Sequence, residues 1–105
     1  MKQTNSQKIQ NKLRLRFIKI GVKMKGPETI FFSEDTQIGK NVVIDPYVVF
    51  GQKVKIGNGV IINSFSYLEN CKIENKVTIG PYARIRPGTI LKTGSKIGNF
   101  VEVKK

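Results

Sequence analysis

The 105-residue sequence contains no histidine, and its one cysteine is Cys71. The absence of histidine excludes imidazole chemistry, and a single cysteine excludes an internal disulfide and a Cys/His zinc site. No segment approaches the roughly 20 consecutive apolar residues needed to span a bilayer. Residues 1–10 lack the apolar stretch and small-residue cleavage pattern of a secretory signal. We therefore expect a cytoplasmic protein with no membrane span, no metal and no cofactor.

Acidic residues are scarce as well, seven against 19 basic residues, which gives a net charge of +12. Every charged residue before Glu28 is basic: Lys2, Lys8, Lys12, Arg14, Arg16, Lys19, Lys23 and Lys25. Clustered cations gain affinity for nucleic acids by releasing counterions from phosphates. Apart from Phe17, however, this segment lacks the interleaved aromatic residues that stack on bases. A basic module that binds polyanions is therefore the weakest hypothesis, and the sequence does not favour nucleic acid as a partner.

Residues 7–20 have the periodicity of a short amphipathic helix. The apolar residues at helical spacing are Ile9, Leu13, Phe17 and Ile20. The helix is expected to end near Gly21, and Gly26-Pro27 breaks the chain again. This pattern predicts a basic, linker-like N-terminal segment, residues 1–27. A basic amphipathic helix can bind membranes, nucleic acid or an acidic partner, but the same pattern serves a helix packed on its own domain, which we favour.

From residue 28 to residue 105 the apolar pattern has a period of six, which is typical of a repeat architecture. Large apolar residues, the anchors, stand at Phe32, Ile38, Ile44, Phe50, Ile56, Ile62 and Leu68, and after one five-residue step at Ile73, Ile79, Ile85, Leu91, Ile97 and Val103. A small or β-branched residue follows each anchor by four places, with Lys72 as the exception. One corner at the short step must therefore be tighter than the others.

Turn-forming residues directly follow the anchors and predict the corners of a coil. Five of them are glycines: Gly39, Gly51, Gly57, Gly80 and Gly98. Three straight sides would close a triangular coil, and coils would stack about 4.8 Å apart through parallel ladder hydrogen bonds. Residues 18 apart then lie one above another. The sequence predicts about four such coils, and each buried anchor contributes about 1.5–3 kcal/mol of transfer free energy.

The hexapeptide pattern resembles the left-handed parallel β-helix of the hexapeptide-repeat acyltransferases. The runs IGPYARIRPG (79–88) and IGNFVEVKK (97–105) are similar to a bacterial family of bifunctional enzymes. That family combines N-acetylglucosamine-1-phosphate uridyltransferase and glucosamine-1-phosphate acetyltransferase activities, and it makes UDP-N-acetylglucosamine for the cell-wall peptidoglycan. Residues 11–13, 21–22 and 27–29 resemble the end of its linker helix and the entry to its first coil. The resemblance implies an all-β fold with a short N-terminal α-helix, a left-handed β-helix being the expected architecture of residues 28–105.

The resemblance also implies a sugar-phosphate site. In that family the arginine before Pro-Gly and the first lysine of the Val-Lys-Lys match bind the sugar phosphate, and here they are Arg86 and Lys104. The two residues are 18 apart, so the repeat places them on the same corner of adjacent coils, where two cations can hold a phosphate. The alternative is that Arg86 pairs with Glu69 and that Lys104 is a solvated residue.

Several groups that the family uses have no counterpart in this sequence. Acetyl transfer there uses a histidine general base and an acetyl-coenzyme A surface, and uridyl transfer uses a separate nucleotide-binding domain. We therefore expect a truncated acetyltransferase domain that is inactive alone and contributes at most part of a sugar-phosphate site. The alternative is half of a split acetyltransferase completed by another chain. The resemblance implies a homotrimer, or a complementary chain that carries the missing coils.

Overall fold

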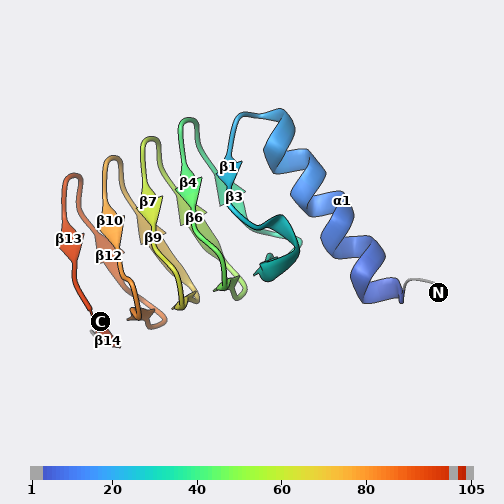
Figure 1. Cartoon of the computed structure of the whole chain (residues 1–105). Coiled ribbons are helices and arrows are strands. Elements are labelled where there is room, and N and C mark those ends of the chain that lie inside the picture. Colours follow the sequence, from blue (N-terminus) through green and yellow to red (C-terminus); the bar gives the residue numbers. More distant parts are fainter. Residues whose placement is uncertain (1–3, 100–101, 104–105) are drawn as a thin grey trace.

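The computed structural model describes residues 4–99 and 102–103, which form a left-handed parallel β-helix preceded by one α-helix. Figure 1 shows the coils stacked side by side, with α1 (Asn5–Lys19) at the N-terminal end of the stack. Four three-sided coils are followed by two sides of a further one. The predicted fold class, about four coils with a short N-terminal helix, is confirmed.

Each side of the helix is one parallel sheet. The first side contains β1 (Lys23–Met24), β4 (Val43–Ile44), β7 (Ile61–Ile62), β10 (Thr78–Ile79) and β13 (Lys96–Ile97). The second contains β2 (Ile30–Phe31), β5 (Val48–Phe50), β8 (Ser66–Leu68), β11 (Arg84–Ile85) and β14 (Glu102–Val103). The third contains β3 (Gln37–Ile38), β6 (Val54–Ile56), β9 (Cys71–Ile73) and β12 (Ile90–Leu91). A 3-10 turn, Pro27–Thr29, joins β1 to β2.

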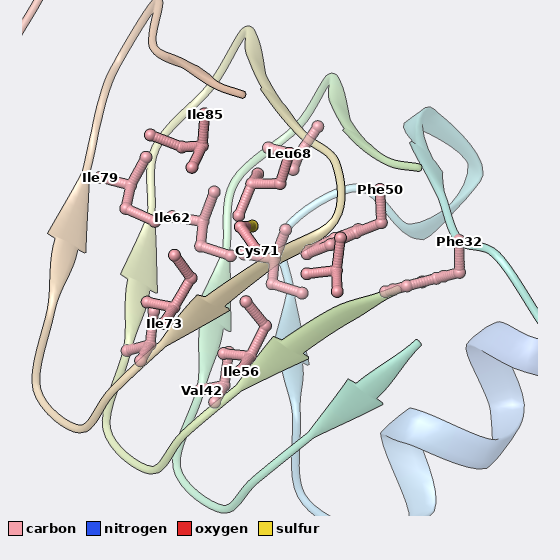
Figure 2. Close-up of a cluster of buried hydrophobic side chains, with 14 of the residues drawn as sticks. Phe32, Val42, Phe50, Ile56, Ile62, Leu68, Cys71, Ile73, Ile79 and Ile85 are labelled. Carbon is pink, nitrogen blue, oxygen red and sulfur yellow. The ribbon is translucent and has the colours of Figure 1, made fainter. Parts of the chain in front are cut away.

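The core consists of ladders of similar side chains that run along the stack. Phe32, Phe50, Leu68 and Ile85 follow one another on the second side (Figure 2), and all four are at most 4% exposed. Ile38 and Ile97 are only partly buried, because β3 and β13 are the edge strands of their sheets among the described residues. Inward serines are satisfied locally, since the hydroxyl of Ser66 donates to the carbonyl oxygen of Asn63 at 3.0 Å. The anchor positions therefore face the core as predicted.

The helix α1 packs on the first coil. Thr4 caps its N-terminus through the backbone N–H of Gln7. Phe17 is buried with its ring centroid 4.7 Å from that of Phe32, and the Gln10 side chain makes two hydrogen bonds with the backbone of Phe32, both 2.8 Å long. Buried Arg14 donates to the carbonyl oxygen of Ile30 at 3.0 Å. This helix packs on its own domain, as favoured from the sequence, although it begins at Asn5 rather than at residue 7.

The position of the corners differs from the prediction. The left-handed backbone conformation falls three places after the anchor, at Asn41, Tyr47, Lys53, Gly59, Phe65, Lys76, Tyr82, Gly88 and Gly94, and two places after it at Asn70, in the short step. Of the five predicted corner glycines, Gly80 has this conformation. Gly39, Gly51 and Gly57, one place after the anchor, are not in that region. A Cβ on Gly57 would lie 3.0 Å from the carbonyl carbon of Glu74 in the next coil. These glycines allow close approach between coils, whereas the chain turns two residues later.

The short step removes one residue from a corner and leaves the ladder intact. Cys71 pairs with Val54, and its side chain is buried at 6% exposure. Cys71 therefore takes the inward place that the six-residue count gave to Lys72, which is exposed. The missing residue lies in the turn between Leu68 and Cys71. The expected tight corner is confirmed. Lys72 is no exception to the pattern, because the short step moves the inward position from Lys72 to Cys71.

Candidate functional site

The corner after the second side brings Glu69 and Arg86 together. Leu68 pairs with Ile85, and the backbone N–H of Glu69 donates to the carbonyl oxygen of Ile85 at 3.2 Å. One place further along, the half-buried side chains of Glu69 and Arg86 therefore occupy equivalent positions on neighbouring coils. The turn itself is tied by the N–H of Gly88, which donates to the carbonyl oxygen of Asn70 at 2.7 Å. Because of the short step, the two positions are 17 residues apart in the sequence rather than 18.

The Glu69 carboxylate has a second neighbour on its own coil. The Tyr67 hydroxyl donates to Glu69 Oε1 at 3.4 Å. A Cβ on Gly51, in the coil before, would lie 3.2 Å from both Cβ and Cγ of Glu69. The stem of Glu69 is thus packed against Gly51, so its carboxylate is held at the corner.

Lys104, the second predicted cation, lies outside the described residues. The register that the prediction relied on is observed directly before it, since Arg84 pairs with Glu102 and Ile85 with Val103. Both pairs have the 18-residue offset that separates Arg86 from Lys104 in the sequence. The assignment of Arg86 and Lys104 to a phosphate remains a prediction.

A charged ladder on another corner has a structural role. Lys92 Nζ lies 3.7 Å from Glu74 Oε2, and the two residues are 18 apart in the sequence. A hydrogen bond from the backbone N–H of Thr93 is the main cause that lowers the pKa of Glu74, and Lys92 adds to it. This corner therefore ties two coils together.

The described residues hold no other evident chemical centre. No group of three or more metal-binding side chains occurs among them. Burial raises the pKa of the Cys71 thiol to about 12, which removes its nucleophilic form at neutral pH. Within the same described ranges, no helix is long and apolar enough to cross a membrane.

One surface feature was not anticipated from the sequence. Tyr47, Phe65 and Tyr82 form a stack at the corner between the first and second sides, with centroid separations of 5.2 and 5.0 Å. All three have positive φ, and they are 45–56% exposed. Large side chains rarely adopt this conformation, and here it does not bury them. Their common place, three residues after an anchor, is the sequence signal that could have revealed the stack.

Comparisons with known proteins agree with this architecture. The family model described as bacterial transferase hexapeptide (six repeats) matches residues 35–70 and 70–105. The bifunctional protein GlmU of Zymomonas mobilis is 51% identical over 96 residues, which cover 91% of this chain and 21% of that protein. GlmU of Wolbachia pipientis wMel is 52% identical over 95 residues, covering 90% of this chain and 22% of the relative. The chain thus spans about a fifth of the length of these relatives.

A solved structure supports the fold independently. The acetyltransferase domain of PglB from Neisseria gonorrhoeae FA1090 superposes with a TM-score of 0.50 and 16% sequence identity. The match covers 90% of this chain and 58% of that domain. At this identity the likeness concerns the fold alone.

Proposed function

Because the chain belongs to the bacterial transferase hexapeptide family, we propose that it forms part of a cytoplasmic glucosamine-1-phosphate N-acetyltransferase and contributes to its sugar-phosphate site. The high identity to GlmU over almost the whole chain supports this proposal. The sequence match includes the corner with Arg86, the residue that resembles the phosphate-binding arginine of that family. The observation that supports the proposal is the coil register, in which Ile85 pairs with Leu68 on one side and with Val103 on the other. Glu69, Arg86 and Lys104 directly follow these three residues in the sequence.

The chemistry of this corner suits a phosphate monoester. A guanidinium offers a planar fork of N–H donors, and an ammonium at the equivalent position of the next coil would add a point charge about 4.8 Å along the stack. Glu69 lies on the other side of Arg86, on the preceding coil. Its carboxylate disfavours an anion placed too far towards the N-terminal coils. The sugar phosphate would therefore bind between Arg86 and Lys104 rather than between Glu69 and Arg86.

Acetyl transfer needs a base that this sequence does not contain. The attacking amine must lose a proton to a group within hydrogen-bond reach whose pKa lies near neutrality. The chain has no histidine, and the pKa of its one thiol is raised far from that range. We therefore propose that the 105-residue chain alone does not transfer acetyl groups. The base and the acetyl-coenzyme A surface would come from further polypeptide, either in the same chain or in a separate one.

We also propose that the working form is a trimer. The aromatic stack of Tyr47, Phe65 and Tyr82 supports this, because it continues onto the second side through exposed Phe31, Val49 and Tyr67. Exposed apolar strips of this kind favour protein–protein contact. A trimer with cyclic symmetry would place this strip against a different surface of the next subunit.

The test is binding of glucosamine 1-phosphate, followed by calorimetry, together with an acetyltransferase assay. The purified chain should bind the ligand weakly and show no turnover, and both R86A and K104A should lose the binding. The control K55A, on the third side, should retain it. Addition of a polypeptide carrying the following GlmU-like coils should restore turnover. Turnover by the chain alone, or binding unaffected by R86A and K104A, would refute the proposal.

A further inference from the structure

The outward surface of α1 combines exposed apolar side chains with cations. Ile9, Leu15, Ile18 and Ile20 are 42–59% exposed, and the helix has no acidic residue. The contact between the helix and the first coil is made by other side chains, among them buried Leu13 and Phe17. The exposed apolar residues therefore do not serve the packing of the helix on its own domain.

Three of these residues, Ile9, Leu15 and Ile20, line a groove of about 660 Å³ along the helix. Its apolar wall includes Ile9, Leu15 and Ile20, and its cations are Lys12, Arg16 and Lys19. Glu34, from the first coil, is its acidic lining residue. From Ile9 to Ile20 the helix rises about 16 Å, which equals three helical turns. The groove thus has the length and the concave shape to take a segment of another helix.

The spacing along this surface is that of a coiled-coil seam. Steps of seven and four residues join Ile9, Arg16 and Ile20, and Leu13, at seam spacing between Ile9 and Arg16, is the buried floor of the groove. Lys12 and Lys19 directly precede two of these seam residues and hold the flanking positions that select a partner by charge. Arg16 is fixed at the seam, since its guanidinium lies 4.8 Å from the Phe17 ring centroid and donates to the carbonyl oxygen of Thr36 at 3.5 Å. A helix that fits here needs apolar seam residues and acidic flanks.

We propose that this groove, the α1 groove, binds an acidic amphipathic helix of a protein partner. A second copy of α1 does not fit, because it would bring cations against cations. An anionic lipid surface complements the lysines, but a flat bilayer cannot enter a concave groove. Nucleic acid would pair with the cations, but it would not bury the exposed isoleucines and leucine of the groove, which would stay in contact with water.

The experiment uses the full chain and a synthetic peptide of about four helical turns with leucine at the seam positions and glutamate on both flanks. Repulsion between its own glutamates keeps this peptide monomeric. We expect saturable binding by fluorescence anisotropy, weakened roughly tenfold by the double substitution K12E/K19E. The matched control K55E/K72E makes the same charge change on the third side and should leave binding unchanged.

The apolar contribution has its own readout. I9S and I20S should each weaken binding severalfold, whereas I18S, outside the groove lining, should not. Circular dichroism of every variant establishes that the fold is retained. The proposal fails if a peptide with lysine in place of glutamate binds equally well, or if K12E/K19E and K55E/K72E have the same effect. It also fails if anionic vesicles or single-stranded DNA bind the chain and the peptide does not.

Discussion

The replacement of Gly57 by alanine should destabilise the fold strongly, although it adds a single methyl group at a corner. The new Cβ would lie 2.5 Å from Asn75 Oδ1 and 3.0–3.1 Å from backbone atoms of Glu74 and Asn75, where ordinary contacts begin at 3.4 Å. Asn75 Oδ1 accepts a hydrogen bond from the backbone N–H of Asn58 at 2.8 Å. The side chain of Asn75 has to move, and the backbone of the next coil blocks relief in the other direction.

The magnitude follows from these two effects. Loss of the hydrogen bond costs about 1 kcal/mol, and crowding against the backbone of a packed neighbour costs about 1–3 kcal/mol. We expect G57A to lower the free energy of unfolding by roughly 2–4 kcal/mol, which corresponds to a fall in Tm of roughly 10–25 °C. Urea denaturation followed by circular dichroism measures the first quantity, and a thermal melt measures the second.

The matched control is G98A, because Gly98 also directly follows an anchor. A Cβ there meets no atom within 4 Å among the described residues, and its φ is not positive. G98A should therefore change the free energy of unfolding by less than about 0.5 kcal/mol. If G57A and G98A behave alike, the role of these glycines in close approach between coils is wrong.

Three further predictions concern the helix, the thiol and two carboxylates. F17A should cost about 3–5 kcal/mol in urea denaturation, because it leaves a cavity between helix and first coil, whereas exposed Ile18 should tolerate alanine. Cys71 should resist iodoacetamide at neutral pH in the native chain and react after unfolding, as mass spectrometry would show, because burial raises its pKa to about 12. Backbone hydrogen bonds lower the folded-state pKa values of Asp35 and Glu74, so their stabilising effect is complete above the unfolded pKa values, about 4, and is lost as the pH falls through the folded values. Melts between neutral and acidic pH should show this loss, and D35N and E74Q should reduce it.

The buried ladders could be predicted from the sequence because each anchor repeats the environment of the one before it. Ile44, Ile62 and Ile79 occupy the same place in successive coils, and all three are fully buried. A pattern that repeats in this way fixes both the period and the inward face. The corners do not repeat one environment in this way. A glycine there is required either because the backbone has a positive φ or because a neighbouring coil approaches closely. The sequence does not distinguish these uses, so Gly39 and Gly57 were assigned to turns.

The contacts that single residues make were not accessible from periodicity. Arg14 has the charge of a solvated helix residue, yet it is buried and donates to the backbone of the first coil. Burial lowers the pKa of this guanidinium, and nearby Glu28 opposes the shift. Likewise, the aromatic stack arises from residues at three left-handed corner positions. Its signal in the sequence is their common place three residues after an anchor, not the hydrophobic period itself. By contrast, the sequence does indicate that Glu69 and Arg86 share a corner, because the five-residue step places them at equivalent positions of neighbouring coils.

The tightened turn between Leu68 and Cys71 shows how this architecture accommodates changes in chain length. The strands on both sides keep their partners, since Leu68 still pairs with Ile85 and Cys71 with Val54. A coil is therefore defined by its paired strands, and the number of residues in a turn is free to vary without altering them. The turn at Asn70 is thus a suitable place to insert a peptide tag or a spectroscopic probe, which would project into solvent while the coils before and after it remain stacked.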